Sequence, residues 1–276
     1  ASELSAKGYY TEAIVVCTDI SNDYPTNALA AQASLKIAQI YQHNLRRPLR
    51  AAEAYIELNF ARGGNDSTAQ AAMFQIGTQL KGEKRWVEAL HVLESFVDSF
   101  PLHAQAGQAL TGIGQIHQAN EAWEDAIAAY TRVINEFAGG VWVREAKWSI
   151  AECTINLSKW REASNAYRDY LTTYASNKKD SRLTEATRRI GVLKDLTRYQ
   201  VLVDEKGQRK AFDAQYQIAT IVALKLSNPV KAIIEYRKVT AKWPTSHFAD
   251  DALFKVGTTY LTMGETRKAR TALLEV

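Results

Sequence analysis

The chain of 276 residues is 46% apolar and 23% charged, which suffices for a buried core beneath a charged surface. A net charge of +4, the balance of 34 basic and 30 acidic residues, does not indicate nucleic acid as a partner. Cys17 and Cys153 form no CxxC pair, which excludes the usual zinc-ribbon, thioredoxin and c-type haem signatures, and no apolar run approaches the length of about 18 residues that spans a membrane.

A recurring eight-residue pattern predicts a series of helices along the chain. In its clearest copies, such as WVEALHVL at 86–93 and WEDAIAAY at 123–130, an aromatic residue or Pro is followed by Ala three positions later and by a large residue four positions after that. The central alanines are Ala13, Ala51, Ala89, Ala126, Ala163, Ala232 and Ala269. Their spacings of 38, 38, 37, 37, 69 and 37 residues indicate an internal repeat with one interruption.

A small residue precedes most of these alanines by 12 or 13 positions, within a segment that has apolar residues at helical spacing. Each repeat is therefore predicted to be a hairpin of a first helix, a turn and a second helix. Only Gly or Ala lets two helix backbones approach within about 8–10 Å, so we expect the small residue where the helices cross, with the large residue beside it. The small residues are Gly77, Gly114, Ala151 and Gly257 at 12 positions, and Ala38 and Ala219 at 13, where a Pro lies in the longer turn.

An aromatic residue followed by Pro or Ala is predicted to end the second helix of each hairpin. It occurs with Pro in DYPTN at 23–27, SFPLH at 99–103 and KWPTS at 242–246, and without Pro in EFAGG and TYASN. Pro cannot continue a helix and moves the preceding residue away from helical geometry. We expect Asn27 and Ser246 to cap the helix that follows.

The 69-residue spacing predicts an incomplete sixth repeat. A single helix is expected over about 182–203, with Gly191 in the place of the small residue and no second helix after it. A polar loop is expected at 204–209.

This interruption divides the predicted solenoid into two segments. Residues 1–205 would hold a partial first repeat, four full repeats and the degenerate sixth helix, and residues 206–276 would hold two further repeats. A change of direction is expected near 175–210.

The densest basic stretch is predicted to be a solvated helix face, because no aromatic residues alternate with it as a base-stacking platform requires. Its members are Lys178, Lys179, Arg182, Arg188 and Arg189.

The order Gly77, Ala89, Leu93 and Pro101 resembles the tetratricopeptide repeat family, and nearly the whole chain follows the same order. The resemblance implies an all-α fold, a right-handed superhelical solenoid of antiparallel helix hairpins with about seven repeats, one of them degenerate. The period of 37–38 residues exceeds the family's usual period of about 34. With the aromatic-Pro end, it is similar to the version found in bacterial outer-membrane-assembly lipoproteins and in the periplasmic Tol-associated repeat protein.

The resemblance also implies a concave groove lined by the first helices, at the second, fifth, ninth and twelfth family positions when the small residue is the eighth. Amides at such positions can both donate to and accept from a peptide backbone, and aromatic rings make good anchors. The alternative for each aromatic residue is packing between neighbouring first helices. The candidate partner-binding residues are Phe74, Trp148, Gln39, Gln108, Gln115, Glu152, Tyr216 and Phe254. Further positions of the same set are Gln32, Leu35, Gln42, Ala71, Thr78, Lys81, Thr111, Gln118, Glu145, Ile155, Asp213, Thr220, Asp251 and Thr258.

No catalytic motif accompanies this pattern. The five histidines have no HxxxH or HExxH spacing, and P-loop, GxSxG and GxGxxG motifs do not occur. We therefore expect no enzyme activity, catalytic residue, metal, cofactor, small-molecule substrate or nucleic acid. The expected function is a non-enzymatic scaffold that binds an extended peptide or a partner helix in the groove, within a bacterial envelope assembly.

Two alternatives stay open, a cytoplasmic scaffold or chaperone and the solenoid arm of a larger enzyme. The expected location is periplasmic or envelope-associated, with the cytoplasm as the alternative. Neither end of the chain shows a polar capping helix. We therefore hypothesise that a partner covers the terminal repeats or that the chain is a section of a longer polypeptide.

Overall fold

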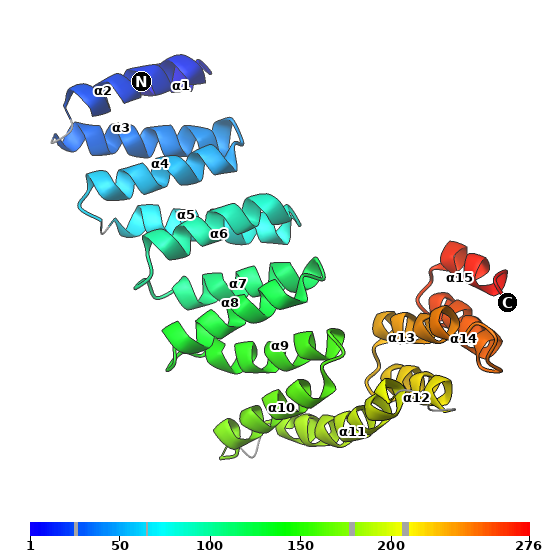
Figure 1. The fold of residues 1–276 in the computed structure, drawn as a ribbon. Helices are drawn as coiled ribbons and strands as arrows, with labels where there is room; N and C mark the ends of the chain where they lie inside the picture. The colour runs from blue at the N-terminus through cyan, green and yellow to red at the C-terminus, as the bar shows by residue number, and fades with distance from the viewer. Residues whose placement is uncertain (25–26, 65, 177–179, 206–209) are drawn as a thin grey trace. The chain divides into compact units, whose positions relative to one another are not determined.

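Figure 1 shows a computed structural model, which describes residues 1–24, 27–64, 66–176, 180–205 and 210–276. Every regular element in these ranges is a helix, and successive helices form antiparallel hairpins, as predicted. The chain divides into two compact units, Ala1–Ala146 and Lys147–Val276.

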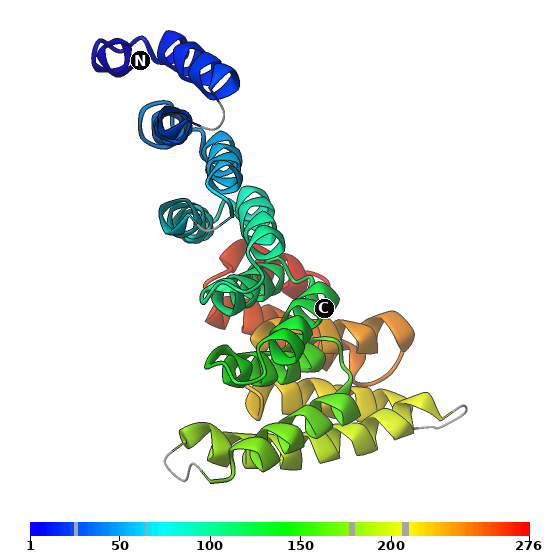
Figure 2. The ribbon, with the colours of Figure 1, turned by 90° about the vertical axis from the view of Figure 1, so that its left-hand side faces the viewer.

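The first unit holds the partial first repeat and three complete hairpins, and α9 begins at its end. Neighbouring hairpins stack, so that α4 contacts α6 and α5 contacts α7. Figure 2 shows the first and the second helices of this part of the chain in two rows. The elements in chain order are α1 (Ser2–Ala6), α2 (Tyr10–Asp23), α3 (Ala28–Gln39), η1 (Ile40–Asn44), α4 (Pro48–Ala61), α5 (Ser67–Gly82), α6 (Trp86–Ser99), α7 (Ala106–Ala119) and α8 (Trp123–Glu136).

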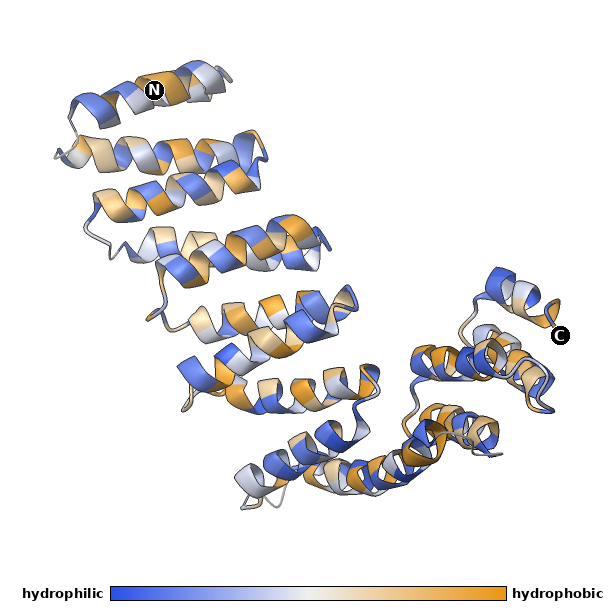
Figure 3. Ribbon diagram, in the orientation of Figure 1, coloured by the Kyte–Doolittle hydropathy of each residue, from blue (hydrophilic) through white to orange (hydrophobic). Residues whose placement is uncertain are grey.

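The second unit holds three hairpins, α9–α10, α12–α13 and α14–α15, and the single helix α11 between the first two. Each helix carries both apolar and polar residues (Figure 3), as expected for helices with one buried face. The elements are α9 (Trp142–Asn156), α10 (Trp160–Tyr174), α11 (Ser181–Asp204), α12 (Ala211–Leu224), α13 (Pro229–Lys242), α14 (Ala249–Thr262) and α15 (Thr266–Leu273).

The small residues lie where the two helices of a hairpin cross, which confirms the packing prediction. A Cβ atom at Gly114 would lie 2.6 Å from Cε1 of Tyr130, the large residue four positions after Ala126. The other two glycines have an equivalent neighbour, the leucine four positions after the central alanine. A Cβ at Gly77 would lie 2.6 Å from Leu93, and a Cβ at Gly257 would lie 2.5 Å from Leu273. All seven central alanines are fully buried.

The turn inside each hairpin contains a left-handed residue five positions before the central alanine. Glu121, with a φ of 59°, is typical of the 12-residue spacing, and the N–H of the next residue, Ala122, donates to the carbonyl of His117 at 2.9 Å. In the hairpins with 13-residue spacing the corresponding backbone hydrogen bond reaches back six residues instead of five. The N–H of Asn228, for example, donates to the carbonyl of Val222 at 3.2 Å. In α3 the extra residue produces the π-helical turn η1. The wider turn therefore absorbs the insertion and keeps the crossing in register.

The aromatic residues that precede Pro or Ala at the repeat boundaries end the second helices, as predicted. Phe100 and Trp243 have extended φ angles of −133° and −137°, while their N–H groups still bond the carbonyl four residues back. Asn27 caps α3, since its Oδ1 accepts the N–H of Leu29 at 2.9 Å. Pro25 lies outside the described residues.

The cap predicted at Ser246 is wrong. A further turn follows Pro244, so that α14 begins only at Ala249 and its N-cap is Phe248. The backbone carbonyl of Ser246 accepts the N–H of Ala249 at 2.9 Å, and its buried hydroxyl has no hydrogen-bond partner among the described residues.

The sixth repeat consists of one long helix, α11, as predicted from the 69-residue spacing. Gly191 does not take the crossing role of the other glycines, because it is exposed and a Cβ there would meet no atom within 4 Å. No second helix returns along this face, so the buried residues of α11 are instead Ala186, Val192, Leu193 and Leu196. The loop expected at 204–209 lies mostly outside the described residues, and the boundary at 205 and the change of direction stay predictions.

A buried polar network links the α9–α10 turn to α13, across the place of the missing helix. Ser158 Oγ donates to Glu235 Oε1 at 2.8 Å, and Lys231 Nζ donates to the carbonyl of Asn156 at 2.6 Å. Glu235 is 1% exposed and also accepts from Gln215 Nε2 at 2.9 Å and from Lys238 at 2.8 Å. Burial alone would raise the pKa of this carboxyl, but the hydrogen bond and charge of Lys238 and the charge of Lys231 hold the pKa below its usual value.

Candidate interaction groove

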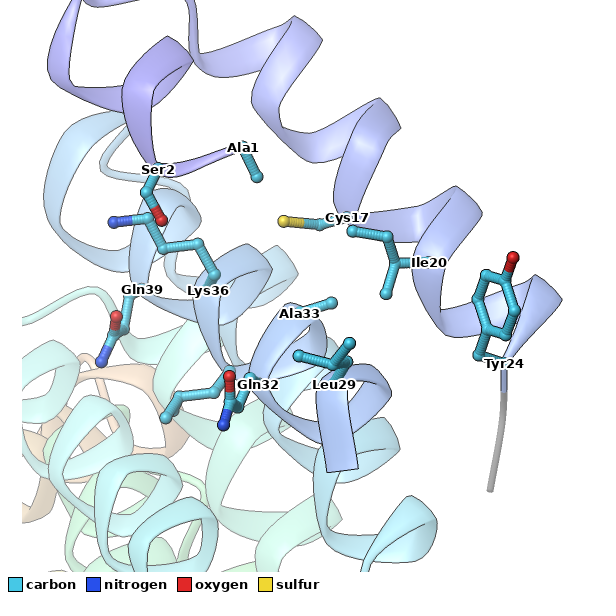
Figure 4. A pocket seen from close by; sticks show the side chains of 11 residues that line it. Ala1, Ser2, Cys17, Ile20, Tyr24, Leu29, Gln32, Ala33, Lys36 and Gln39 are labelled. Atoms are coloured by element: carbon cyan, nitrogen blue, oxygen red, sulfur yellow. The ribbon is translucent and has the colours of Figure 1, made fainter. Parts of the chain in front are cut away.

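A pocket in the first unit is lined by three of the positions expected in the concave groove. Gln32, Leu35 and Gln39 of α3 line a volume of about 330 Å³ together with Cys17 and Ile20 of α2. Figure 4 labels the lining residues Gln32 and Gln39 on α3 and Cys17 and Ile20 on α2. The floor is apolar, and Gln32 and Gln39 are exposed at the edge. Such a hollow fits an apolar side chain whose neighbouring backbone the amides can bond.

A second pocket, of about 390 Å³, lies in the second unit between α12 and α14. Tyr216, Thr220 and Thr258 line it, and all three are expected groove positions. The walls also include Leu224 and Lys255. In both units, therefore, the faces of first helices border open hollows.

Buried tyrosines form hydrogen bonds with several groove residues from the core side. In four hairpins the large residue after the alanine is Tyr, and its hydroxyl bonds a polar residue of the first helix. The pairs are Tyr55 with Gln42 at 2.7 Å, Tyr130 with Gln118, Tyr167 with Glu152 at 2.5 Å, and Tyr236 with Thr220 at 3.1 Å. This link was missed from the sequence, although the choice of Tyr over Leu four positions after the alanine was its signal. Because these side chains are fixed before a partner arrives, less conformational entropy is lost on binding.

Three of the four candidate aromatic anchors pack against neighbouring rings. Phe74 is 7% exposed, with its ring centroid 5.5 Å from that of Phe96. Trp148 lies edge-on to Tyr167 at 5.1 Å and to Tyr170 at 5.4 Å.

Tyr216 stacks on Phe248 at 4.6 Å, whereas Phe254 is 51% exposed on α14. Phe74 and Trp148 thus pack on the second helices α6 and α10 rather than between first helices, and Tyr216 packs on Phe248 at the start of the neighbouring first helix α14. Phe254 is the candidate with a largely free ring. The binding role of all four stays a prediction.

Glu152 and Trp148 share an arginine from α11. Arg189 bonds Glu152 Oε1 at 2.6 Å and Glu185 Oε1 at 2.7 Å, and its guanidinium lies 5.7 Å from the centre of the Trp148 ring. Hydrogen bonds from Arg188 and then Arg189 lower the pKa of Glu185 to about 2.

The expectation that the basic stretch is a solvated face is therefore wrong for Arg189 and Arg182, whereas Arg188 is exposed as expected. Arg189 is largely buried where α11 packs on α10, and Arg182 lies 5.3 Å from the centre of the Trp148 ring. Arg188 bonds Glu185 and the carbonyl of Lys225. Lys178 and Lys179 lie outside the described residues.

The remaining polar candidates differ in how they are held. Gln115 is exposed and accepts from Lys81 Nζ at 2.7 Å, which bridges the first helices α5 and α7. Gln39 is exposed in the pocket of the first unit, and Gln108 is half-buried on α7. These amides are spread along the first-helix row rather than gathered at one point.

Within the described ranges, no three His, Cys, Asp or Glu side chains come together in a way that could hold a metal ion. Among the same residues, no helix combines the length and apolar character needed to cross a membrane.

Comparison with known proteins finds one family match. Residues 251–276 match the model of the tetratricopeptide repeat, and this segment contains the Gly257–Leu273 crossing described above. The same crossing geometry recurs at Gly77 and Gly114 in the other unit. No similar sequence was found among curated proteins.

The solved structures that match this chain share little sequence with it. A tetratricopeptide repeat protein from Parabacteroides merdae is 14% identical, with 88% of this chain and 90% of that chain covered and a TM-score of 0.44. The P58(IPK) TPR domain is 12% identical, with 98% and 89% covered and a TM-score of 0.40. YrrB, described as a TPR protein with an unusual peptide-binding site, is 14% identical, with 80% and 89% covered and a TM-score of 0.34.

Proposed function

We propose that this chain, in which residues 251–276 match the tetratricopeptide repeat and the same hairpin crossing recurs at Gly77 and Gly114, is a non-enzymatic scaffold whose first-helix faces bind protein partners. The observation that carries the proposal is the location of the two pockets. Residues assigned to the groove by the repeat pattern, among them Gln39 in one unit and Thr258 in the other, line open hollows of peptide size.

The chemistry of these hollows suits a peptide or a helix from another protein. Apolar floors accept side chains, and edge amides such as Gln32 and Gln39 can pair with backbone groups. The tyrosine-held side chains behind the groove support binding by a preformed surface.

We further propose that the scaffold belongs to a bacterial envelope assembly and acts in the periplasm. The repeat period of 37–38 residues and the aromatic-Pro end of each hairpin support this placement. Fractionation of native cells with an antibody to the chain tests it, because the chain should be released with periplasmic or membrane-associated proteins. Recovery in the cytoplasmic fraction alone would favour a cytoplasmic scaffold instead.

Site-specific photo-crosslinking in native cells tests the groove itself. A photoreactive residue at Gln39 or Thr258 is expected to capture a protein, since both positions line hollows. The matched control is Val87, an exposed residue on the second helix α6. Equal capture from Val87, or capture from Val87 alone, would overturn the proposed use of the first-helix faces.

A further inference from the structure

The groove between α12 and α14 changes from acidic to apolar along its length. Asp213 and Asp251, near the start of the two helices, occupy equivalent groove positions, and Tyr216 and Phe254 follow one turn later on the same faces. The hydroxyls of Thr220 and Thr258 come next, and Leu224 and Leu261 lie beyond them. A ligand lying along the groove therefore meets carboxylates at one end and aliphatic side chains at the other.

The two carboxylates are available for a partner. Asp213 and Asp251 have no hydrogen-bond or ion-pair partner within the described part of the chain, and neither Lys210 nor Lys255 comes within the 4.0 Å of an ion pair. Asp251 lies close enough to Tyr216 that its charge adds to burial and to Tyr236 in raising the pKa of the Tyr216 hydroxyl. The charge of Asp251 thus acts on a side chain that lines the groove.

The threonines of this groove offer few donors. Thr220 Oγ1 donates to the carbonyl of Tyr216 at 2.9 Å, and Thr258 Oγ1 donates to that of Phe254 at 3.0 Å. Thr259 and Thr262 donate to carbonyls of α14 in the same way. These threonine side chains therefore offer a ligand only their methyl groups and the lone pairs of their hydroxyl oxygens. The other donors that line the pocket are the side chains of Gln217 and Lys255 and the hydroxyls of Tyr216 and Tyr236. An extended peptide would need a donor for each successive carbonyl, whereas a helix satisfies its own backbone bonds.

Three large apolar side chains are exposed on the two helices that form this groove, and one of them, Leu224, lines the pocket itself. Leu224 is 76% exposed, Phe254 51% and Leu261 49%. An amphipathic helix presents apolar side chains at spacings of three, four and seven residues, which matches a row of such contacts.

We propose that this groove binds an amphipathic helix whose apolar face covers Leu224, Phe254 and Leu261 and whose Lys or Arg side chains reach Asp213 and Asp251. The inference rests on the proposed scaffold function and names its partner chemistry. A basic end would find carboxylates that have no other partner, and an acidic end would be repelled by them. Lys255, the cation of the pocket wall, is exposed on a flexible stem and can turn to solvent.

Three synthetic peptides test the proposal against the intact chain by fluorescence anisotropy at low salt. All three carry the same apolar ridge. The first has Lys and Arg at one end, the second has Glu in their place, and the third is the basic peptide with two central prolines that prevent a helix. The basic helix is expected to bind about 10-fold more tightly than the acidic one, and the proline peptide to bind more weakly by a similar factor.

Variants place the binding in this groove. The double variant Asp213→Asn with Asp251→Asn should remove the preference for the basic peptide, and Phe254→Ala should weaken both helical peptides. The matched control is Asp125→Asn, a change at an exposed carboxylate of α8 that should leave both affinities unchanged. Circular dichroism checks that each variant keeps its helices.

The outcomes separate this inference from the scaffold function. Equal or tighter binding of the acidic peptide overturns the charge assignment, and equal binding of the proline peptide overturns the helix. Binding that ignores Phe254→Ala, or no binding of any peptide at millimolar concentration, overturns the assignment of this groove. In each of these cases, crosslinking from Gln39 and Thr258 still decides the scaffold function independently.

Discussion

The hairpin of α7 and α8 is held together by an apolar crossing, whereas buried charges join α13 to the α9–α10 turn across the place of the helix that the sixth repeat lacks. At Gly114 the backbone of α7 comes so close to the Tyr130 ring that no side chain fits between them. Where the sixth repeat lacks its second helix, Glu235 and Lys231 of α13 reach the α9–α10 turn. A regular repeat is thus specified by shape, and its interruption is bridged by hydrogen bonds directed at single atoms.

The charged network of Glu235 and Lys231 carries an unfavourable desolvation free energy that the apolar crossing at Gly114 does not. Removing Glu235 and Lys231 from water is unfavourable, and only several well-placed partners offset the loss. Glu235 has such partners from Ser158, Gln215 and Lys238. Disrupting one partner should therefore cost more than a steric change in the regular hairpin.

The largest effect is expected from Glu235→Ala. The change leaves the buried Lys231 without its carboxylate, and the free energy of unfolding should fall by about 3–5 kcal/mol. Urea denaturation followed by tryptophan fluorescence measures it. The control Glu53→Ala, which removes an exposed ion pair with Arg50, should cost less than about 1 kcal/mol. A similar small loss for both variants would contradict the bridging role.

A smaller loss is expected from Gly114→Ala. The new methyl would overlap the Tyr130 ring, and overpacking of this kind costs about 1–3 kcal/mol. In a double variant with Tyr130→Leu the loss should be less than the sum of the two single losses, because the branched side chain can move aside. Strict additivity in urea denaturation would show that the two residues do not touch in solution.

The charged bridge should also respond to pH in a way that the apolar crossing does not. Because the pKa of Glu235 is lowered in the folded chain, its stabilisation is fully present above the pKa of the unfolded chain, about 4.3, and is lost as the pH falls through the folded pKa. Glu235→Gln lacks this titration, so its unfolding free energy should fall less between pH 5 and pH 3 than that of the unchanged chain, as measured by urea denaturation at each pH. Gly114→Ala should keep the pH profile of the unchanged chain. Parallel profiles for the unchanged chain and Glu235→Gln would argue against the contribution of this carboxylate.

The smallest effect, of opposite sign, is expected from Gly191→Ala. A Cβ there meets nothing within 4 Å, so the variant should gain about 1 kcal/mol from the higher helix propensity of Ala. A thermal melt compared with that of Gly114→Ala measures the contrast. Destabilisation by Gly191→Ala would mean that another element packs on this face of α11.

Much of the fold follows from local patterns in the sequence. The small residue and the large residue of a hairpin are close in the chain, and their spacing predicts the contact of Gly77 with Leu93 and of Gly114 with Tyr130. Helix ends at Phe100 and the cap at Asn27 are equally local. The cap at Ser246 failed because residues after Pro244 form one more turn, which local composition does not reveal.

The candidate groove was predictable only in part. The positions of Gln32, Leu35 and Thr258 follow from helix periodicity, which decides which side of a helix faces outward. Periodicity cannot distinguish an exposed ring such as Phe254 from one covered by a neighbour, as Trp148 is by Arg189.

The sequence by itself determined the hairpins, their close crossings and the single helix of the sixth repeat, because each depends on residues within about one repeat. The tertiary structure alone decided which surfaces replace the missing helix. Ser158 and Glu235 are 77 residues apart, and nothing in either local pattern marks the other as a partner. Such a contact depends on where the intervening helices place two faces in space, which is a property of the whole unit rather than of any segment.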